Sequence, residues 1–373
     1  MFQQEKKQSI SLENFGLIID QGKRELPKVV ESDNMVSNPE NEINIDSNKT
    51  YSQDWEAYNQ AQTQEKIIFL ELLHELVSQV PQPKRTGAGR PSANLGEMIF
   101  SCCLKTYLDF SSRRSESDIR LSQQLQYLDH IPHFNTVLKY FNQPIMKKAL
   151  TKLIEASSLP LKEIETDFTM DSSGFSTVMY GHWLEKRLIF NEHKTFKKAH
   201  VMSGVKTNII THIEVTDGYV ADGLLLETLV KNTSKNFQMR EVSADKGYLS
   251  EKSLGFIFQH GAIPFIPFKN NVKYSTENKS PIWNIMFRFF KDNKKEFMRH
   301  YHKRNNAESV FSMMKRKFGS NVRGKSSLVQ ENEILCKALC HNICVLIQEM
   351  FELGIKVDFS EVTIQEFMCK IEM

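Results

Sequence analysis

The sequence lacks long hydrophobic runs, a secretory signal and a large excess of charge of either sign. None of its apolar stretches approaches the roughly 18–20 residues that a helix needs to cross a bilayer, and no charged segment followed by an apolar one stands at its start. We therefore expect no membrane span, and six reduced cysteines in a cytoplasmic protein. The net charge of +3 is too small to identify a partner.

Paired cysteines of the zinc-site type are also missing. Structural zinc sites commonly take their ligands from turns, as Cys-x2-Cys pairs. Here Cys336, Cys340 and Cys344 recur every fourth residue, with His341 between them. This spacing places the three thiols on one helical stripe beside apolar side chains. Small core residues are the favoured interpretation, and a metal site on the stripe is the weaker alternative.

Charge is unevenly distributed along the chain. The first 60 residues are acidic, whereas residues 291–325 are strongly basic. A locally basic face on a near-neutral chain favours a polyanionic partner, although a solvated face of lysines and arginines is the ordinary alternative. Glu308 is the only acid between Glu296 and Glu331. It suits either an ion pair on a helix or a metal ligand among cations that hold a phosphate backbone.

The N-terminal part predicts a disordered or poorly ordered tail at 1–50, followed by an all-helical domain at 51–158. A turn at 131–133 leads into a helix with polar first residues, which is the general form of a helix-turn-helix recognition element. Arg113 and Arg114 are candidate DNA contacts in this domain. The apolar spacing predicts helices at about 55–80, 94–109, 115–124, 134–142 and 144–157.

Residues 159–352 predict an α/β domain, and residues 353–373 a C-terminal extension. The order is three strands, a helix, a strand, a helix, a strand and further helices, which predicts a mixed sheet flanked by helices on both faces. The first expected strand is at 166–174, with a β-like segment at 175–180 after it, and the other expected strands are at 198–206, 208–215, 239–243 and 262–268. The expected helices are at 221–234, 249–259, 279–298, 304–318 and 329–352.

Three carboxylates stand where this topology would bring them together. Asp171 ends the first predicted strand, Asp245 follows the strand at 239–243, and Glu308 lies on a later helix. Close carboxylates repel one another unless a cation neutralises them, and hard divalent cations such as Mg²⁺ prefer oxygen ligands. Each acid also has an ordinary alternative: a turn or cap role for the aspartates, and an ion pair with Arg304 or Lys315 for Glu308. Asp167 competes for the place of the first acid.

The sequence around these acids resembles that of the DDE transposases of prokaryotic insertion sequences, whose third acid lies in a Tyr-x2-Arg-x3-Glu-x6-Lys signature. This chain has Tyr301, Arg304, Glu308 and Lys315 at that spacing. Asp-Ser-Ser-Gly-Phe at 171–175 and Ala-Asp-Lys-Gly-Tyr at 244–248 are similar to the first and second acid motifs of the family. The resemblance runs from about Asp54 to Phe351.

The resemblance implies a ribonuclease-H-like catalytic domain in which Asp171, Asp245 and Glu308 bind two Mg²⁺ ions, with Mn²⁺ as a substitute. Trp183 is a candidate for stacking on a flipped base, although a core tryptophan is the favoured interpretation. The implied contacts to the DNA strand are Tyr301, Arg304 and Lys315, with Lys303, Arg316 and Lys317 beside them.

The function implied is that of a transposase that binds the terminal inverted repeats of its element through the helical domain and cuts and joins strands. It would act on double-stranded repeat and target DNA as a homodimer, in the nucleoid of a prokaryotic cell and away from membranes. Two alternatives stay open. One is a catalytically silent DNA-binding protein descended from a transposase, and the other is a DNA-processing nuclease on the same fold.

Overall fold

The computed structural model describes residues 54–83, 88–89, 92–178, 196–269, 272 and 279–359. The predictions for the tail at 1–50, for Trp183 and for most of the extension at 353–373 lie outside these residues.

Helices precede the sheet at the positions that the apolar spacing predicts. Their starts have identifiable causes: the Asp54 carboxylate accepts the N–H groups of Glu56 and Ala57, the Asn94 side chain caps the next helix, and Pro144 begins the last one. The elements are α1 (Trp55–Ser78), α2 (Leu95–Tyr107), α3 (Glu116–Gln124), α4 (Phe134–Phe141) and α5 (Pro144–Ser158).

A five-stranded mixed sheet follows, in the order β3-β2-β1-β4-β5. β1 is antiparallel to β2 and parallel to β4, so that it stands at the junction of an antiparallel and a parallel half. The strands are β1 (Asp167–Ser176), β2 (Phe196–Gly204), β3 (Ile210–Asp217), β4 (Glu241–Ala244) and β5 (Ile263–Phe265). The mixed α/β class predicted from the sequence is confirmed.

The first strand does not end at Asp171 as predicted, but runs to Ser176. Its parallel ladder with β4 stops at the pair Met170 and Ala244, whereas its antiparallel ladder with β2 continues to Ser176. Gly174 does not break the strand. A Cβ there would come within 3.0 Å of the Phe196 ring on β2, so the glycine allows a close approach.

Two predicted helices are also divided. The helix expected at 279–298 is two helices, α9 (Pro281–Asp292) and α10 (Lys294–Tyr301), because Asn293 has a non-helical backbone between them. The helix expected at 221–234 begins with a short 3-10 turn at Asp222–Leu224 and continues as α7 (Leu226–Thr233).

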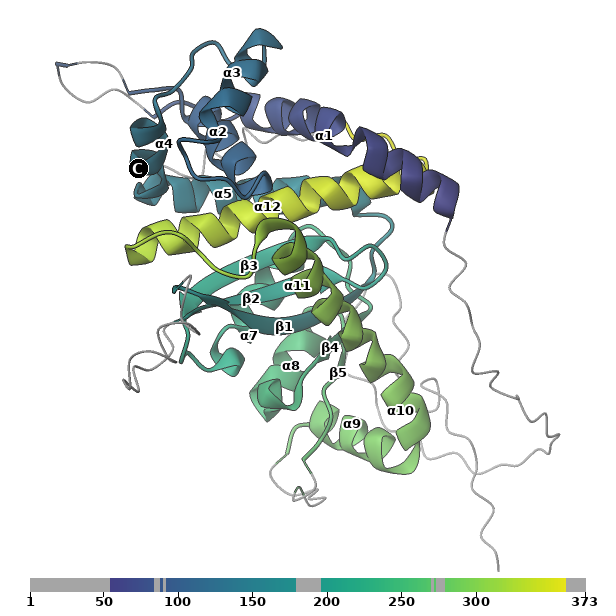
Figure 1. Cartoon of the computed structure of the whole chain (residues 1–373). Coiled ribbons are helices and arrows are strands. Elements are labelled where there is room, and N and C mark those ends of the chain that lie inside the picture. Colours follow the sequence, from purple (N-terminus) through teal and green to yellow (C-terminus); the bar gives the residue numbers. More distant parts are fainter. Residues whose placement is uncertain are drawn as a thin grey trace, which may run out of the picture.

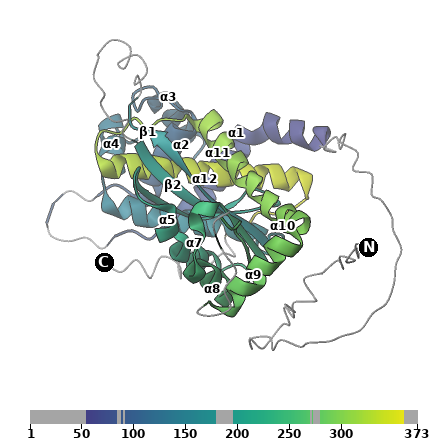
Figure 2. The ribbon, with the colours of Figure 1, turned by 90° about the horizontal axis from the view of Figure 1, so that it is seen from below.

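Helices cover both faces of the sheet. α7, α8 (Glu251–Gln259) and α9 pack with Phe168 and Met170 of β1 in one hydrophobic cluster. α5, α11 (Asn305–Phe318) and α12 (Ser327–Glu352) cover the other face, where they pack with Phe175. Figures 1 and 2 show α12 on the opposite side of the sheet from α7 and α8. Consequently the face that carries Phe175 also looks toward α11.

α12 is the shared core helix of the chain. It packs against α1, α2 and α5 as well as against β3, so one hydrophobic cluster runs through both the helical part and the sheet part. By length and composition it could cross a membrane, which corrects the expectation that no apolar run approaches that length. Yet 83% of its most apolar window is buried inside the protein, and this burial explains its composition. The domain division at residue 158 stays a prediction.

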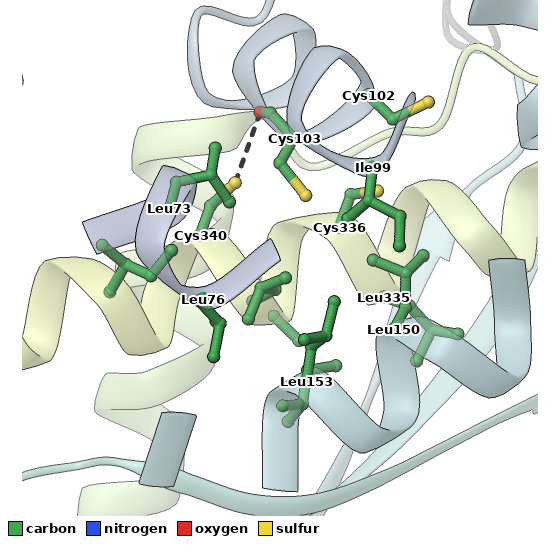
Figure 3. Close-up of a cluster of buried hydrophobic side chains, with 14 of the residues drawn as sticks. Leu73, Leu76, Ile99, Cys102, Cys103, Leu150, Leu153, Leu335, Cys336 and Cys340 are labelled. Carbon is green, nitrogen blue, oxygen red and sulfur yellow. Dashed lines mark hydrogen bonds between the residues drawn. The ribbon is translucent and has the colours of Figure 1, made fainter. Parts of the chain in front are cut away.

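The cysteine stripe lies in this core. Cys336, Cys340 and Cys344 are buried free thiols, and the Cys340 Sγ donates a hydrogen bond of 3.4 Å to the carbonyl of Cys103. Figure 3 shows Cys336 and Cys340 among leucines of α1 and α5. Burial raises the pKa of Cys344 to about 12, so these thiols are small apolar core residues, as the favoured interpretation has it.

Candidate active site

Asp171 and Asp245 are brought side by side by the register of β1 and β4. The two strands run parallel and pair Met170 with Ala244, so the next residue on each strand is one of the two predicted acids. Neighbouring strands lie about 4.8 Å apart, and residues in register point to the same face. Both carboxylates therefore project from the same face of the sheet, at the position where the parallel ladder ends.

Asp245 has a structural role as well. It is the first residue after β4 and caps the 3-10 turn Lys246–Tyr248, where its Oδ2 accepts the N–H of Gly247 at 3.3 Å. One of its two carboxylate oxygens is thus engaged by a single backbone hydrogen bond. Asp245 therefore has the capping role that the sequence allowed, and it still lies beside Asp171.

Arg304 joins the first acid to the third. It ends the 3-10 turn His302–Arg304, directly before α11. Its Nη2 lies 3.3 Å from Asp171 Oδ2 and its Nη1 lies 3.2 Å from Glu308 Oε1. The Glu308 side chain is 61% exposed, so it remains open to solvent. The ion pair between Arg304 and Glu308 exists, and it also ties Glu308 to Asp171.

The pKa of Asp171 responds to the charges of these neighbouring side chains. Burial raises the pKa of Asp171, and the negative charges of Glu308 and Asp245 raise it further, while a hydrogen bond from the Ser172 backbone and the charge of Arg304 oppose the rise. The pKa of Tyr301 is also raised, mainly by burial, with contributions from Asp245 and Asp171. The three acids therefore interact with Tyr301 and Arg304 across one small volume.

Asp167 lies four residues before Asp171 on the same face of β1, where its strand partner is Glu241. This inner pair is neutralised within the protein. Arg240 binds Asp167 through Nε at 2.9 Å and Nη2 at 2.7 Å, and the Lys303 ammonium lies 2.7 Å from both Asp167 and Glu241. Although burial opposes it, these partners lower the pKa of Asp167. Asp171, whose pKa is raised, is the carboxylate that needs another cation.

The remaining candidate cations divide into two groups. Lys315 lies at the site: its ammonium donates to Ser173 Oγ at 2.6 Å and lies 5.2 Å from the centre of the Phe175 ring. Arg316 is exposed on the same helix. Lys303 and Lys317 are engaged elsewhere, since Lys303 pairs with the inner acids and Lys317 pairs with Glu65 of α1.

Arg113 and Arg114 lie in the helical layer, apart from the acids. Both are exposed, on the turn before α3. The Arg113 guanidinium lies 5.1 Å from the Phe134 ring centre, and that of Arg114 lies 4.2 Å from the Phe110 ring centre. The position of Trp183 is outside the described residues.

Sequence reasoning missed the network of Arg240, His300 and Glu241 below the site. His300 Nδ1 lies 2.9 Å from Glu241 Oε2, and its ring stacks on Phe265 of β5. No local pattern could have found it, because its members come from separate strands and from α10. It also missed a second group in which Glu97, Asp129 and His130 place ligand atoms within 4.8 Å of one another. There the Glu97 carboxylate already accepts the N–H of Asp129 at 3.0 Å.

Comparison with known proteins matches the part of the chain that carries this acid cluster. Residues 165–343, which contain all three acids, match the family model of the transposase DDE domain. This part of the chain therefore belongs to the transposase DDE domain family.

A particular relative extends the match beyond that domain. The chain is 22% identical, over 293 residues, to a probable transposase for insertion sequence element ISA1214 of Archaeoglobus fulgidus. The aligned part covers 78% of this chain and 86% of that protein. No solved structure matches the chain.

Proposed function

We propose that the chain is a DNA transposase that binds the terminal inverted repeats of its element and carries out metal-dependent strand cleavage and strand transfer. The observation that carries this proposal is the register that sets Asp171 beside Asp245, with Arg304 holding Glu308 next to them. We assign a ribonuclease-H-like fold to residues 159–352, on the support of the sheet order and of the junction at β1.

The donor set suits hard divalent cations. Asp171, Asp245 and Glu308 offer only carboxylate oxygens, which Mg²⁺ and Mn²⁺ prefer, and few protein ligands suffice when phosphate and water complete the coordination. Burial and the charges of Glu308 and Asp245 raise the pKa of Asp171, and a bound cation would offset the repulsion among the three carboxylates. Two bound ions would supply activation of a water or 3′-hydroxyl and stabilisation of the leaving oxygen at phosphorus.

The protein's own cations would handle the DNA strand. The Arg304 guanidinium neutralises two carboxylates. Its planar geometry also matches a phosphate, so it can bind the phosphate backbone of DNA at the site. Its Nε is buried without a hydrogen-bond partner among the described residues, which leaves a donor for that contact. Lys315 on α11 would hold the strand beside Ser173. We assign structural roles to Lys303 and Lys317, whose charges are paired internally.

Recognition of the repeats is assigned to the helical domain at 51–158, with Arg113 and Arg114 near α4. A homodimer would hold two element ends together with target DNA, in the nucleoid of a prokaryotic cell. The relative's name, a probable transposase for an insertion sequence, supports this assignment.

The test is strand joining of an end-labelled oligonucleotide, carrying the inverted repeat that flanks the reading frame, into a plasmid with Mg²⁺. Glu308→Gln is expected to lower joining by about a thousandfold, since metal-ion stabilisation amounts to several kcal/mol and each 1.36 kcal/mol is about tenfold. Binding of the repeat should persist. Glu296→Gln is the matched control, because Glu296 lies in the same basic tract and pairs with Arg299.

Each outcome separates the candidates. Joining that survives Glu308→Gln would remove Glu308 from the triad. A protein that binds the repeat but neither cleaves nor joins with Mg²⁺ or Mn²⁺ would be the silent DNA-binding descendant. Cleavage without any joining would identify a nuclease.

A further inference from the structure

A cavity of about 260 Å³ lies in the helical layer, between α2, the turn before α3, α4 and the start of α12. α4 and α12 contact each other there, as Figures 1 and 2 show from two directions. The segment that follows α11 contributes Arg323 and Gly324 to its wall. The cavity is therefore built from the predicted recognition region and from the chain that leads away from Glu308.

Two buried polar groups that line this cavity lack ordinary partners. Lys105 of α2 is 5% exposed, and among the described residues its ammonium has no hydrogen bond or ion pair, only the face of the Phe141 ring at 5.3 Å. The Ser112 Oγ is buried without a hydrogen-bond partner. The wall therefore offers two hydrogen-bond donors to an anion.

The charged side chains of the wall are also mainly positive. Lys105, Arg113 and Arg323 line the cavity against one carboxylate, that of Glu333. The Glu333 Oε2 already accepts the backbone N–H groups of Arg323 at 2.9 Å and Gly324 at 3.1 Å. Arg323 is paired with Asp109 at 2.9 Å, whereas the Arg113 guanidinium has no carboxylate partner within the described chain. Lys105 and Arg113 remain available for an anion.

The rest of the wall is apolar. Phe134, Leu138 and Phe141 share one face of α4 and line the cavity together with Val329 of α12. The ring of Phe134 has the Arg113 guanidinium over its face, and its centre lies 4.1 Å from that of the His133 ring. Aromatic rings beside cations bind nucleotides because bases stack on the ring while phosphate pairs with the charge. A small inorganic anion would leave this apolar wall uncovered.

We propose that this cavity binds one nucleotide of the DNA strand, with its phosphate on Lys105, Ser112 and Arg113 and its base against the Phe134 wall. The proposal rests on the proposed function, since it takes the nucleotide to be part of the transposase's DNA.

The position of the cavity predicts which nucleotide it takes. Ten residues of α11 separate Glu308 from Phe318, about 15 Å of helix at 1.5 Å per residue, and Arg323 follows shortly after. One strand of DNA advances about 3.4 Å per nucleotide. The bound nucleotide therefore lies on the order of five steps from the scissile phosphate, with Lys315 between the two points.

The experiment measures the affinity of the full-length protein for the repeat oligonucleotide by fluorescence anisotropy over a series of salt concentrations. Lys105→Met keeps the apolar stem and removes the charge, and Arg113→Gln does the same at an exposed position. Each is expected to weaken binding about tenfold and to lower the slope of log affinity against log salt by about 1. Lys252→Met is the control: Lys252 is 80% exposed on α8, across the sheet.

Base stacking is tested with 2-aminopurine placed five steps from the cleavage site. Its fluorescence should fall on binding to the unmodified protein and recover in Phe134→Ala. Unfolding curves show whether each variant is folded.

Unchanged affinity and salt slope in both charge variants would overturn the proposal. So would a deoxynucleoside monophosphate that stabilises the unmodified protein but not Lys105→Met while DNA binding stays the same, because the cavity would then take free nucleotides. Strand joining by the unmodified protein reports on the proposed function separately. Normal joining combined with unchanged slopes removes the cavity's role alone.

Discussion

Replacing Asp171 by asparagine should make the metal-free protein more stable and should greatly reduce its stabilisation by Mg²⁺. Burial and the charges of Glu308 and Asp245 raise the pKa of Asp171. For an acid, a pKa that is higher in the folded protein means that ionisation destabilises the fold, so this cost appears as pH rises through the pKa and is fully present at neutral pH. The amide carries no charge and avoids the cost, which gives Asp171→Asn the higher melting temperature without metal.

The magnitude of the metal response follows from binding linkage. An ion that binds only the folded protein stabilises it by RT ln(1 + [ion]/Kd), which is about 1.4 kcal/mol at ten times the dissociation constant. At about 2.1 cal/mol/K per residue, the entropy of unfolding of 373 residues is about 0.8 kcal/mol/K, so each kcal/mol corresponds to about 1.3 °C. Mg²⁺ should therefore raise the melting temperature of the unmodified protein by about 2 °C, and that of Asp171→Asn by much less.

Scanning calorimetry at constant ionic strength, with Mg²⁺, Mn²⁺ or matched KCl, measures both effects. Asp167→Asn is the matched control, because Asp167 lies on the same strand and face but is paired with Arg240 and Lys303. Asp167→Asn should melt lower, since it removes a largely buried carboxylate that binds both Arg240 and Lys303, and yet keep the full Mg²⁺ increment. An increment that persists in Asp171→Asn and disappears in Asp167→Asn would refute the reasoning and make Asp167 the first acid.

Two further predictions concern the core. Although burial opposes it, hydrogen bonds to Glu155 and Glu214 raise the pKa of His212, so stability should fall as pH rises through that pKa, and urea unfolding between about pH 6 and pH 9 should show a flatter dependence in His212→Gln. The five described thiols have pKa values raised by burial, so native Cys369→Ser should not react with a thiol reagent until it unfolds; rapid labelling of the native variant would contradict their burial.

The local elements were accessible from the sequence because their causes are local. Helices such as α1 and α4 follow from apolar spacing and from capping side chains next to them in the chain. The order of strands and helices predicted a mixed sheet, and the spacing of Tyr301, Arg304, Glu308 and Lys315 pointed to the family. The errors in these elements have different causes. β2 extends β1 beyond Asp171, and the non-helical backbone of Asn293 divides a helix whose apolar spacing continues across it.

The roles of individual charges were decided only by the tertiary structure. Asp167 and Asp171 share a face by the period of two, and the sequence favoured Asp171 only by its place at the expected strand end, before Ser-Ser-Gly. Arg240 and Lys303 reach one and not the other, and this difference sets which carboxylate still needs a cation. The unpaired ammonium of Lys105 arises in the same way, from helices that meet across a wide sequence separation. Burial and ion pairing act through space, so a sequence names the candidate groups while their neighbours in the fold determine what each one can bind.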